Sequence, residues 1–148
     1  MDAKTTKEAS SLTEAWINHP DHPIVKAMVL ERSLFFCILP FFRAFGNDGM
    51  RTTSADISRD EQIHVATNSL VCAELGLSPS PSLDRLRKAT ASWIFDSLKG
   101  VEKLDKKFWT DSSDRLMYQG KAPQLSFTQS ARMPAFFEHS NVNLPQYA

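Results

Sequence analysis

The 148 residues of this chain suffice for one domain, and 42% hydrophobic residues against 23% charged ones predict a substantial apolar core. The 17 basic residues balance the 17 acidic ones, so no overall field would attract the chain to nucleic acid or anionic lipid. No apolar run reaches the roughly 18 residues of a membrane span, no hydrophobic signal segment stands at the amino terminus, and the two cysteines form no close pair. We therefore expect a globular cytoplasmic protein with neither a nucleic-acid nor a membrane partner.

The first part of the chain predicts one short helix followed by a long buried one. Residues 1–10 are polar and are expected to be flexible, and a capping-box spacing predicts a helix start at Ser11. Two His-Pro pairs should end this helix near Asn18. Residues 24–45 are almost entirely apolar and predict a buried central helix, kinked at Pro40.

Three more helices are predicted downstream. The second long helix should begin after Ser54 and run to Leu75 with Gly76 as its cap, and its expected inward face carries Ile57, Glu61, His64, Asn68, Val71 and Leu75. A Ser-Pro turn with an N-cap serine opens the next helix, and an amphipathic helix follows over residues 101–118. The predicted fold is an all-α unit over residues 11–120 with an extended C-terminal arm over residues 121–148.

Three residues of these helices have the chemistry of a metal site. Glu31 lies in the most apolar helix, where a lone ionised carboxylate costs several kcal/mol and needs a cation. Glu61 and His64 stand three residues apart, on one face of the next helix. Ferritin-like bundles build carboxylate-bridged di-metal sites from a Glu on each of two helices and a Glu-x-x-His on each of two others. This chain offers one of each, so three of six ligands are missing.

Four segments resemble one family. The residues from Ile57 to His64 have the sequence Ile-Ser-Arg-Asp-Glu-Gln-Ile-His, which resembles the Ser-Arg-Asp-Glu-x-x-His signature of the radical-generating small subunit of class I ribonucleotide reductase. Leu30 to Phe36 resembles the Val-Glu-Gly-x-Phe-Phe helix of that family, and two shorter segments, at residues 114–117 and 136–138, follow in the same order. The resemblance covers residues 24–148 and corresponds to the C-terminal half of a complete small subunit, which implies a partial ferritin-like helical bundle that a partner chain completes.

The resemblance implies a role for each matching residue. Glu31, Glu61 and His64 would ligate iron in a di-iron or manganese–iron centre shared with a partner chain. Arg59 and Asp60 would lie behind the metal, where Asp60 would orient a metal-bound histidine and join the radical-transfer path. The family also has an apolar pocket around its radical, whose positions here are Phe35, Leu39 and Ile57, and a relay tyrosine in its tail, for which Tyr147 is the candidate.

The resemblance also implies partners. The first carboxylate of the family, its first Glu-x-x-His and its radical tyrosine belong to an N-terminal half that this chain lacks, so a second chain would supply them. The large subunit of the reductase is the other expected partner, in a higher oligomer. A split subunit would suit a phage or viral genome, which would place the protein in the host cytoplasm.

Two other hypotheses remain open. A symmetric homodimer would bring together four carboxylates and two histidines and act as a ferritin-like di-metal oxidase or metal-binding protein. A non-enzymatic helical protein would use its Phe-rich face only for docking.

Overall fold

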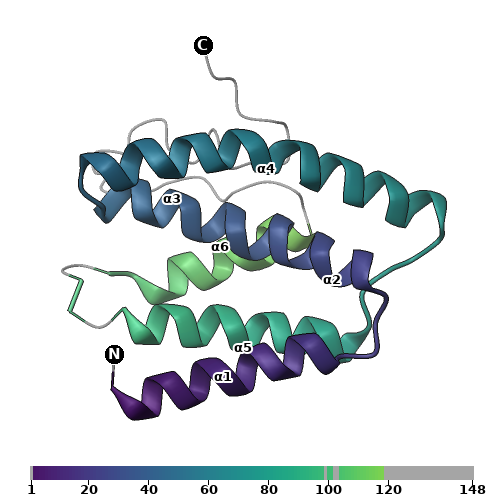
Figure 1. Ribbon diagram of the computed structural model, residues 1–148, viewed down its shortest axis with the longest axis horizontal. Coiled ribbons are helices and arrows are strands. Elements are labelled where there is room, and N and C mark those ends of the chain that lie inside the picture. Colours follow the sequence, from purple (N-terminus) through teal and green to yellow (C-terminus); the bar gives the residue numbers. More distant parts are fainter. Residues whose placement is uncertain (1, 99, 102–103, 119–148) are drawn as a thin grey trace.

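The computed structural model describes residues 2–98, 100–101 and 104–118, and all regular secondary structure of these residues is helical (Figure 1). The elements in chain order are α1 (Ala3–Asn18), α2 (Pro23–Val29), the π-helix η1 (Leu30–Phe35), α3 (Phe36–Phe45), α4 (Asp48–Glu74), α5 (Pro81–Ser97) and α6 (Lys106–Tyr118). The all-α prediction is confirmed for this part of the chain, and the arm predicted over residues 121–148 lies outside it. None of the helices described is both long and apolar enough to cross a membrane.

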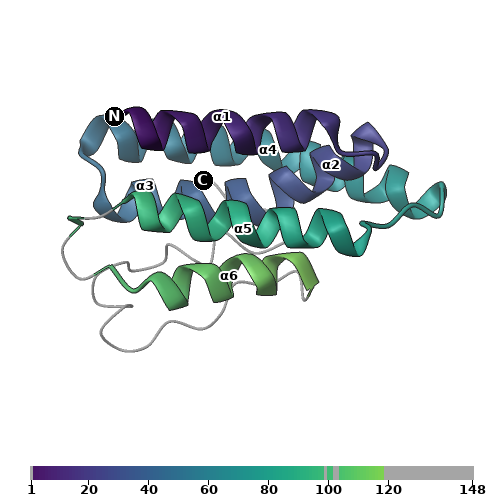
Figure 2. The ribbon, with the colours of Figure 1, turned by 90° about the horizontal axis from the view of Figure 1, so that it is seen from below.

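The segment α2–η1–α3 forms a central rod on which other helices pack. Helix α4 runs back along this rod on one side, while α5 and α6 pack against each other and against the rod on the other (Figures 1 and 2). Helix α1 lies along α5, at the edge of the molecule in Figure 1. The metal-ligand candidates therefore come from the rod and from the helix that flanks it.

Two apolar clusters explain why the rod is buried. One centres on aromatic rings, with Trp109 stacked on Phe95 at 5.8 Å and edge-on to Phe41 at 5.4 Å between ring centroids. The other surrounds Val29 and Leu83, both fully buried. Burial of such side chains contributes roughly 1.5–3 kcal/mol each, so the rod supplies much of the core, as its sequence predicts.

The rod departs from α-helical geometry before its proline. Pro40 lies inside α3, and a π-helical stretch precedes it, in which the Phe36 N–H donates to the Glu31 carbonyl. A proline removes one amide donor and crowds the preceding turn, and π-helical turns are a known way for a helix to deviate locally. As a result, Glu31 lies on a widened turn.

Helix boundaries differ from the predictions where a cap was overlooked. Helix α1 starts at Ala3 rather than Ser11, because the Asp2 carboxylate accepts the Thr5 N–H at 2.8 Å. Residues 3–10, expected to be flexible, are thus helical. Helix α4 starts at Asp48 rather than after Ser54, with Asn47 as its N-cap.

The end of α4 and the start of α5 are as expected, whereas the start of α6 is not. Gly76 has φ +63° and follows α4, and the Leu77 N–H donates to the Cys72 carbonyl at 2.8 Å, which closes a Schellman cap. Ser80 caps α5 by accepting the Leu83 N–H. Helix α6 begins at Lys106, five residues later than predicted.

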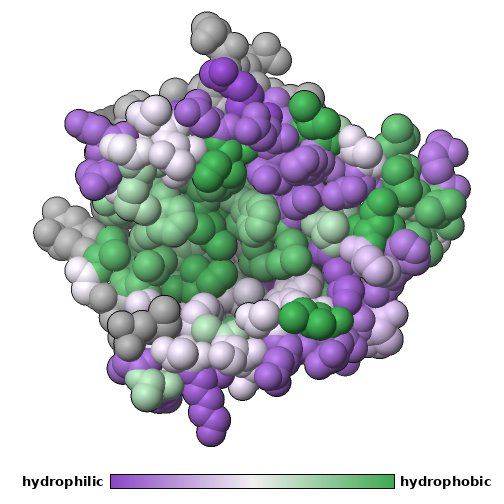
Figure 3. All heavy atoms as spheres, viewed as in Figure 1, coloured by the Kyte–Doolittle hydropathy of each residue, from purple (hydrophilic) through white to green (hydrophobic). Residues whose placement is uncertain are grey.

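The face of α4 that meets the core is a different one from that predicted. The buried positions are Ser54, Ser58, Gln62, Val65 and Cys72, whereas the expected inward residues Ile57 and Leu75 are 40% and 61% exposed. The predicted apolar face therefore lies beside the core instead of in it. The face seen in Figure 3 also carries apolar side chains across the rod, between the more polar surfaces of α4 and α1.

Candidate metal centre

Glu31, Glu61 and His64 converge as the sequence predicts. One ligand atom from each lies within 4.8 Å of the others. The His64 Nδ1 atom is 3.0 Å from Glu61 Oε2 and 3.9 Å from Glu31 Oε1. The Glu-x-x-His spacing sets the first contact within one turn of α4, and packing of α4 against η1 sets the second.

The charges of this cluster are mutually dependent. Burial and the neighbouring Glu61 carboxylate raise the pKa of Glu31, opposed by a hydrogen bond from Asn68. The hydrogen bond with Glu61 and the charges of both carboxylates raise the pKa of His64. Two carboxylates held this close repel each other, and either a proton on His64 or a cation between them relieves that repulsion.

The cluster is open on one side. The side chains of Glu31 and Glu61 are 16% and 17% exposed, but that of His64 is 57% exposed. Among the described residues, these three side chains are the acidic and histidine groups that lie close enough together to bind one metal ion. Three protein ligands leave coordination positions free, and carboxylate with imidazole is a donor set suited to iron or manganese. The residues present therefore fit a site that could hold a metal ion.

Arg59 and Asp60 lie beside the cluster on α4, and both are exposed. The Asp60 carboxylate contributes to the raised pKa of His64. Neither side chain is enclosed, so the roles predicted for Arg59 and Asp60 behind the metal stay predictions.

The three residues of the predicted radical pocket differ in their exposure to solvent. Leu39 is buried in the core, whereas Phe35 and Ile57 are each 40% exposed. Phe35 follows Glu31 by four residues and Ile57 precedes Glu61 by four, so both lie about one turn from a ligand. The role of these three residues in a radical pocket stays a prediction. Tyr147 lies outside the described residues.

Two features were missed at the sequence level, one at the cluster and one between α5 and α6. Asn68 donates a hydrogen bond from Nδ2 to Glu31 Oε2 at 2.6 Å; the shared face of residues 61, 64 and 68 indicates that Asn68 lies near the ligands, but not that Glu31 is its partner. Arg87 is fully buried and binds Asp84, Asp114 and the Ser113 hydroxyl. The i,i+3 pair of Asp84 and Arg87 was the available signal for that network.

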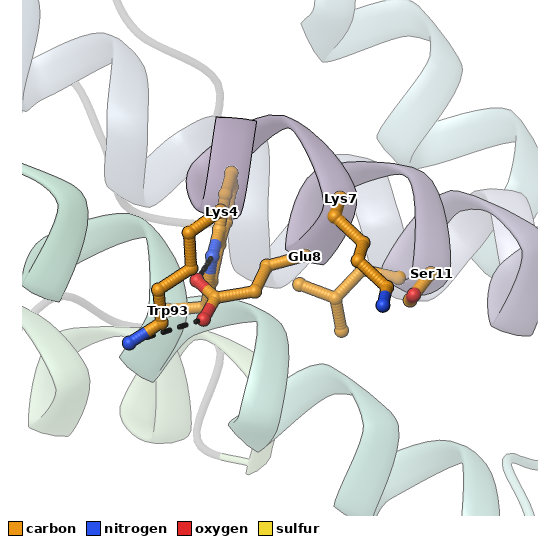
Figure 4. Close-up of a pocket in the computed structure, with 6 residues that line it drawn as sticks. Lys4, Lys7, Glu8, Ser11 and Trp93 are labelled. Carbon is orange, nitrogen blue, oxygen red and sulfur yellow. Dashed lines mark hydrogen bonds and ion pairs between the residues drawn. The ribbon is translucent and has the colours of Figure 1, made fainter. Parts of the chain in front are cut away.

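One surface hollow is lined by residues other than the three ligand candidates. This hollow of about 430 Å³ lies between α1 and α5 and is lined by Trp93 and Leu12 with three charged side chains (Figure 4). There the Glu8 carboxylate accepts the Trp93 Nε1–H at 3.0 Å and pairs with Lys4 at 3.9 Å. Glu8, Trp93 and Lys4 thus bind one another, and we interpret the hollow as part of the packing contact between α1 and α5.

Comparison of the chain with protein-family models, with curated proteins and with solved structures finds no match.

Proposed function

We propose that this chain is the C-terminal part of a split ribonucleotide reductase small subunit and supplies half the ligands of a di-iron centre. The observation that carries the proposal is the convergence of Glu31, Glu61 and His64 on one open face of η1 and α4. The sequence around these residues resembles the family signature, and the proposed bundle is ferritin-like. A separate N-terminal part would contribute the remaining ligands and the radical tyrosine.

The exposed side of the cluster supports a partner chain. Phe35 and Ile57 are large apolar side chains that are each 40% exposed, and each flanks a ligand by about one turn. A complete bundle would bury this apolar surface together with the metal. Because burial of apolar area stabilises association by about 25 cal/mol per Å² before its entropic costs, the same face would serve both assembly and metal binding.

The core side of α4 supports the same arrangement. Its buried positions are mostly small or polar, and two buried polar atoms there, Gln62 Nε2 and Ser69 Oγ, lack a hydrogen-bond partner within the described residues. The larger apolar side chains of α4 lie on its outer flanks. A helix that exposes its apolar residues and buries polar ones is typical of an element that has a second packing partner.

In the proposed centre, Glu31, Glu61 and His64 would hold iron, which when bound supplies the oxidising chemistry that forms a tyrosyl radical for reduction of ribonucleotides to deoxyribonucleotides. The work of this chain is positioning and charge compensation. The two carboxylates attract and orient the cation, and His64 must release its proton before Nδ1 or Nε2 can bind a metal. Neighbouring apolar side chains would exclude water once covered.

The proposal is tested by isolating the chain from its native source under gentle conditions. We expect a co-purifying protein that carries a Glu-x-x-His motif and a buried tyrosine, and a complex that reduces ribonucleotides only when the large subunit is added. The chain alone should bind iron weakly and show no reductase activity. Full activity of this chain with the large subunit alone would contradict the proposal.

A second candidate function uses the same open face differently. Two copies of the chain, facing each other across a two-fold axis, would supply four carboxylates and two histidines, a full di-metal set. The purified chain would then hold about two metals per dimer without any other protein. Sedimentation together with metal analysis separates this dimer from the split-subunit assembly.

A purely docking protein is separated from both by the double variant Glu31→Ala, His64→Ala, which would leave the biological effect of such a protein unchanged.

A further inference from the structure

Asn68 contacts the candidate metal centre from outside the set of three ligands. Its Nδ2 atom donates a hydrogen bond to Glu31 Oε2 over 2.6 Å and spans from α4 to η1. Asn68 follows His64 by one turn and Glu61 by two, so all three lie on the same face of α4. The site thus includes an amide that is not itself an obvious ligand.

We propose that Asn68 is a positioning residue that reserves Glu31 Oε2 and leaves Glu31 Oε1 as the metal-binding atom. This inference rests on the metal centre of the proposed function. It concerns how Glu31 binds, with one oxygen or with both, and not whether the chain belongs to a reductase.

The geometry assigns the two oxygens to different partners. Glu31 Oε2 accepts from Asn68, while Glu31 Oε1 lies 3.9 Å from His64 Nδ1, on the side of the other two ligands. A carboxylate that must also accept a hydrogen bond through one oxygen is biased toward binding a cation through the other. Loss of the amide donor would free the carboxylate to rotate or to bind through both oxygens.

The same hydrogen bond counters the repulsion within the cluster. Glu31 is close to Glu61, and its carboxylate is largely withdrawn from water. A charge-assisted hydrogen bond from a neutral amide stabilises the ionised carboxylate. A lysine ammonium would do so too, but it would compete with the metal cation for the carboxylate. The Asn68 hydrogen bond therefore offsets part of the cost of holding the Glu31 carboxylate beside Glu61 and fixes its orientation.

The test is a titration of the full chain with Co²⁺, followed by calorimetry and by the visible absorption of the bound ion. Asn68→Leu keeps the branched shape of the side chain but removes the donor, and Asn68→Ser leaves a hydroxyl too short to reach Glu31. Both should weaken Co²⁺ binding by about tenfold or more and change the absorption spectrum, because groups that orient metal ligands typically contribute 10–100-fold to affinity. Asn68→Gln, which retains an amide donor, should recover most of the lost affinity.

Gln62→Leu is the matched control, because it makes the same replacement on the same helix at an amide whose nitrogen has no hydrogen-bond partner within the described residues. It should leave the Co²⁺ affinity and spectrum unchanged. Circular dichroism of every variant verifies that α4 is intact. Wild-type affinity and spectrum in folded Asn68→Leu or Asn68→Ser, or binding by Asn68→Gln as weak as that of Asn68→Leu, would overturn the positioning role alone. No Co²⁺ binding by the wild-type chain at millimolar concentration would overturn the metal centre and this inference with it.

Discussion

Replacement of Glu31 by glutamine should stabilise the metal-free chain while it weakens metal binding. The glutamine side chain keeps an oxygen that can accept the Asn68 hydrogen bond, but the replacement removes one of two carboxylates whose ligand atoms lie within 4.8 Å. If Glu31 served folding alone, its replacement by glutamine should instead lower the free energy of unfolding. Opposite signs for stability and binding are typical of functional sites that hold like charges together.

The magnitude follows from Coulomb's law. Two unit charges 4.8 Å apart repel by about 0.9 kcal/mol at the dielectric constant of water and by about 3.5 kcal/mol at an effective value of 20. The cluster is open to solvent on the side of His64, and that imidazole offsets part of the repulsion. We therefore expect Glu31→Gln to raise the free energy of unfolding by about 1 kcal/mol, or Tm by about 2–4 °C.

The assay is urea and thermal unfolding of the metal-free chain at pH 7 with a chelator present. Glu14→Gln is the control, because Glu14 is an exposed glutamate of α1 that forms no ion pair within the described part of the chain, and it should change stability by less than about 0.5 kcal/mol. A decrease in the free energy of unfolding of about 0.5 kcal/mol or more in Glu31→Gln, beyond the control, would refute the argument that charge repulsion at this site opposes folding.

Three further predictions concern stability. Arg87→Met should lower the free energy of unfolding, measured by urea titration, by about 3 kcal/mol. The replacement leaves two aspartates and a buried serine hydroxyl without their shared donor. An effect below about 1 kcal/mol would contradict the importance of this network. Gln62→Leu should raise stability by about 1 kcal/mol, since it removes a buried amide nitrogen without a partner among the described residues, and a loss of stability would show that the amide has a function in the fold. The metal-free chain should lose stability as the pH rises from about 5 to about 8. The raised pKa of Glu31 favours the folded state only while that carboxyl is protonated, and the raised pKa of His64 stabilises it until His64 loses its proton. A Glu31→Gln, His64→Gln double variant should flatten this profile in thermal melts, and an equally steep profile would refute the assignment.

The helices were predictable because their signals are local. The apolar run of residues 24–45, the Gly76 cap and the Ser80 N-cap each act within a few residues, and the structure contains all three features. The start of α1 was misplaced because Asp2 caps a helix with few apolar residues, so periodicity gave no sign of it. Local capping chemistry outweighed the polar composition there.

The convergence of the three ligand candidates was also predictable, because the Glu-x-x-His spacing places two of them on one helix face and Glu31 could only be accommodated near a cation. The exposure of that face to solvent could not be predicted from the sequence. Periodicity shows that Ile57, Glu61 and His64 share a face, but it does not show whether this chain or another covers it. The π-helix around Glu31 and the Asn68 hydrogen bond depend on tertiary packing, which no local pattern encodes.

The most direct test of the account is the iron content of the complex isolated through a tag on this chain. The account predicts about two irons for each pair of this chain with a partner that carries the complementary Glu-x-x-His. His64→Ala should reduce that content sharply, whereas Ile63→Ala, its exposed neighbour on α4, should leave it unchanged. Two irons bound by this chain without a partner chain, or an iron content indifferent to His64→Ala, would contradict the claim that the chain supplies half of a shared di-metal centre.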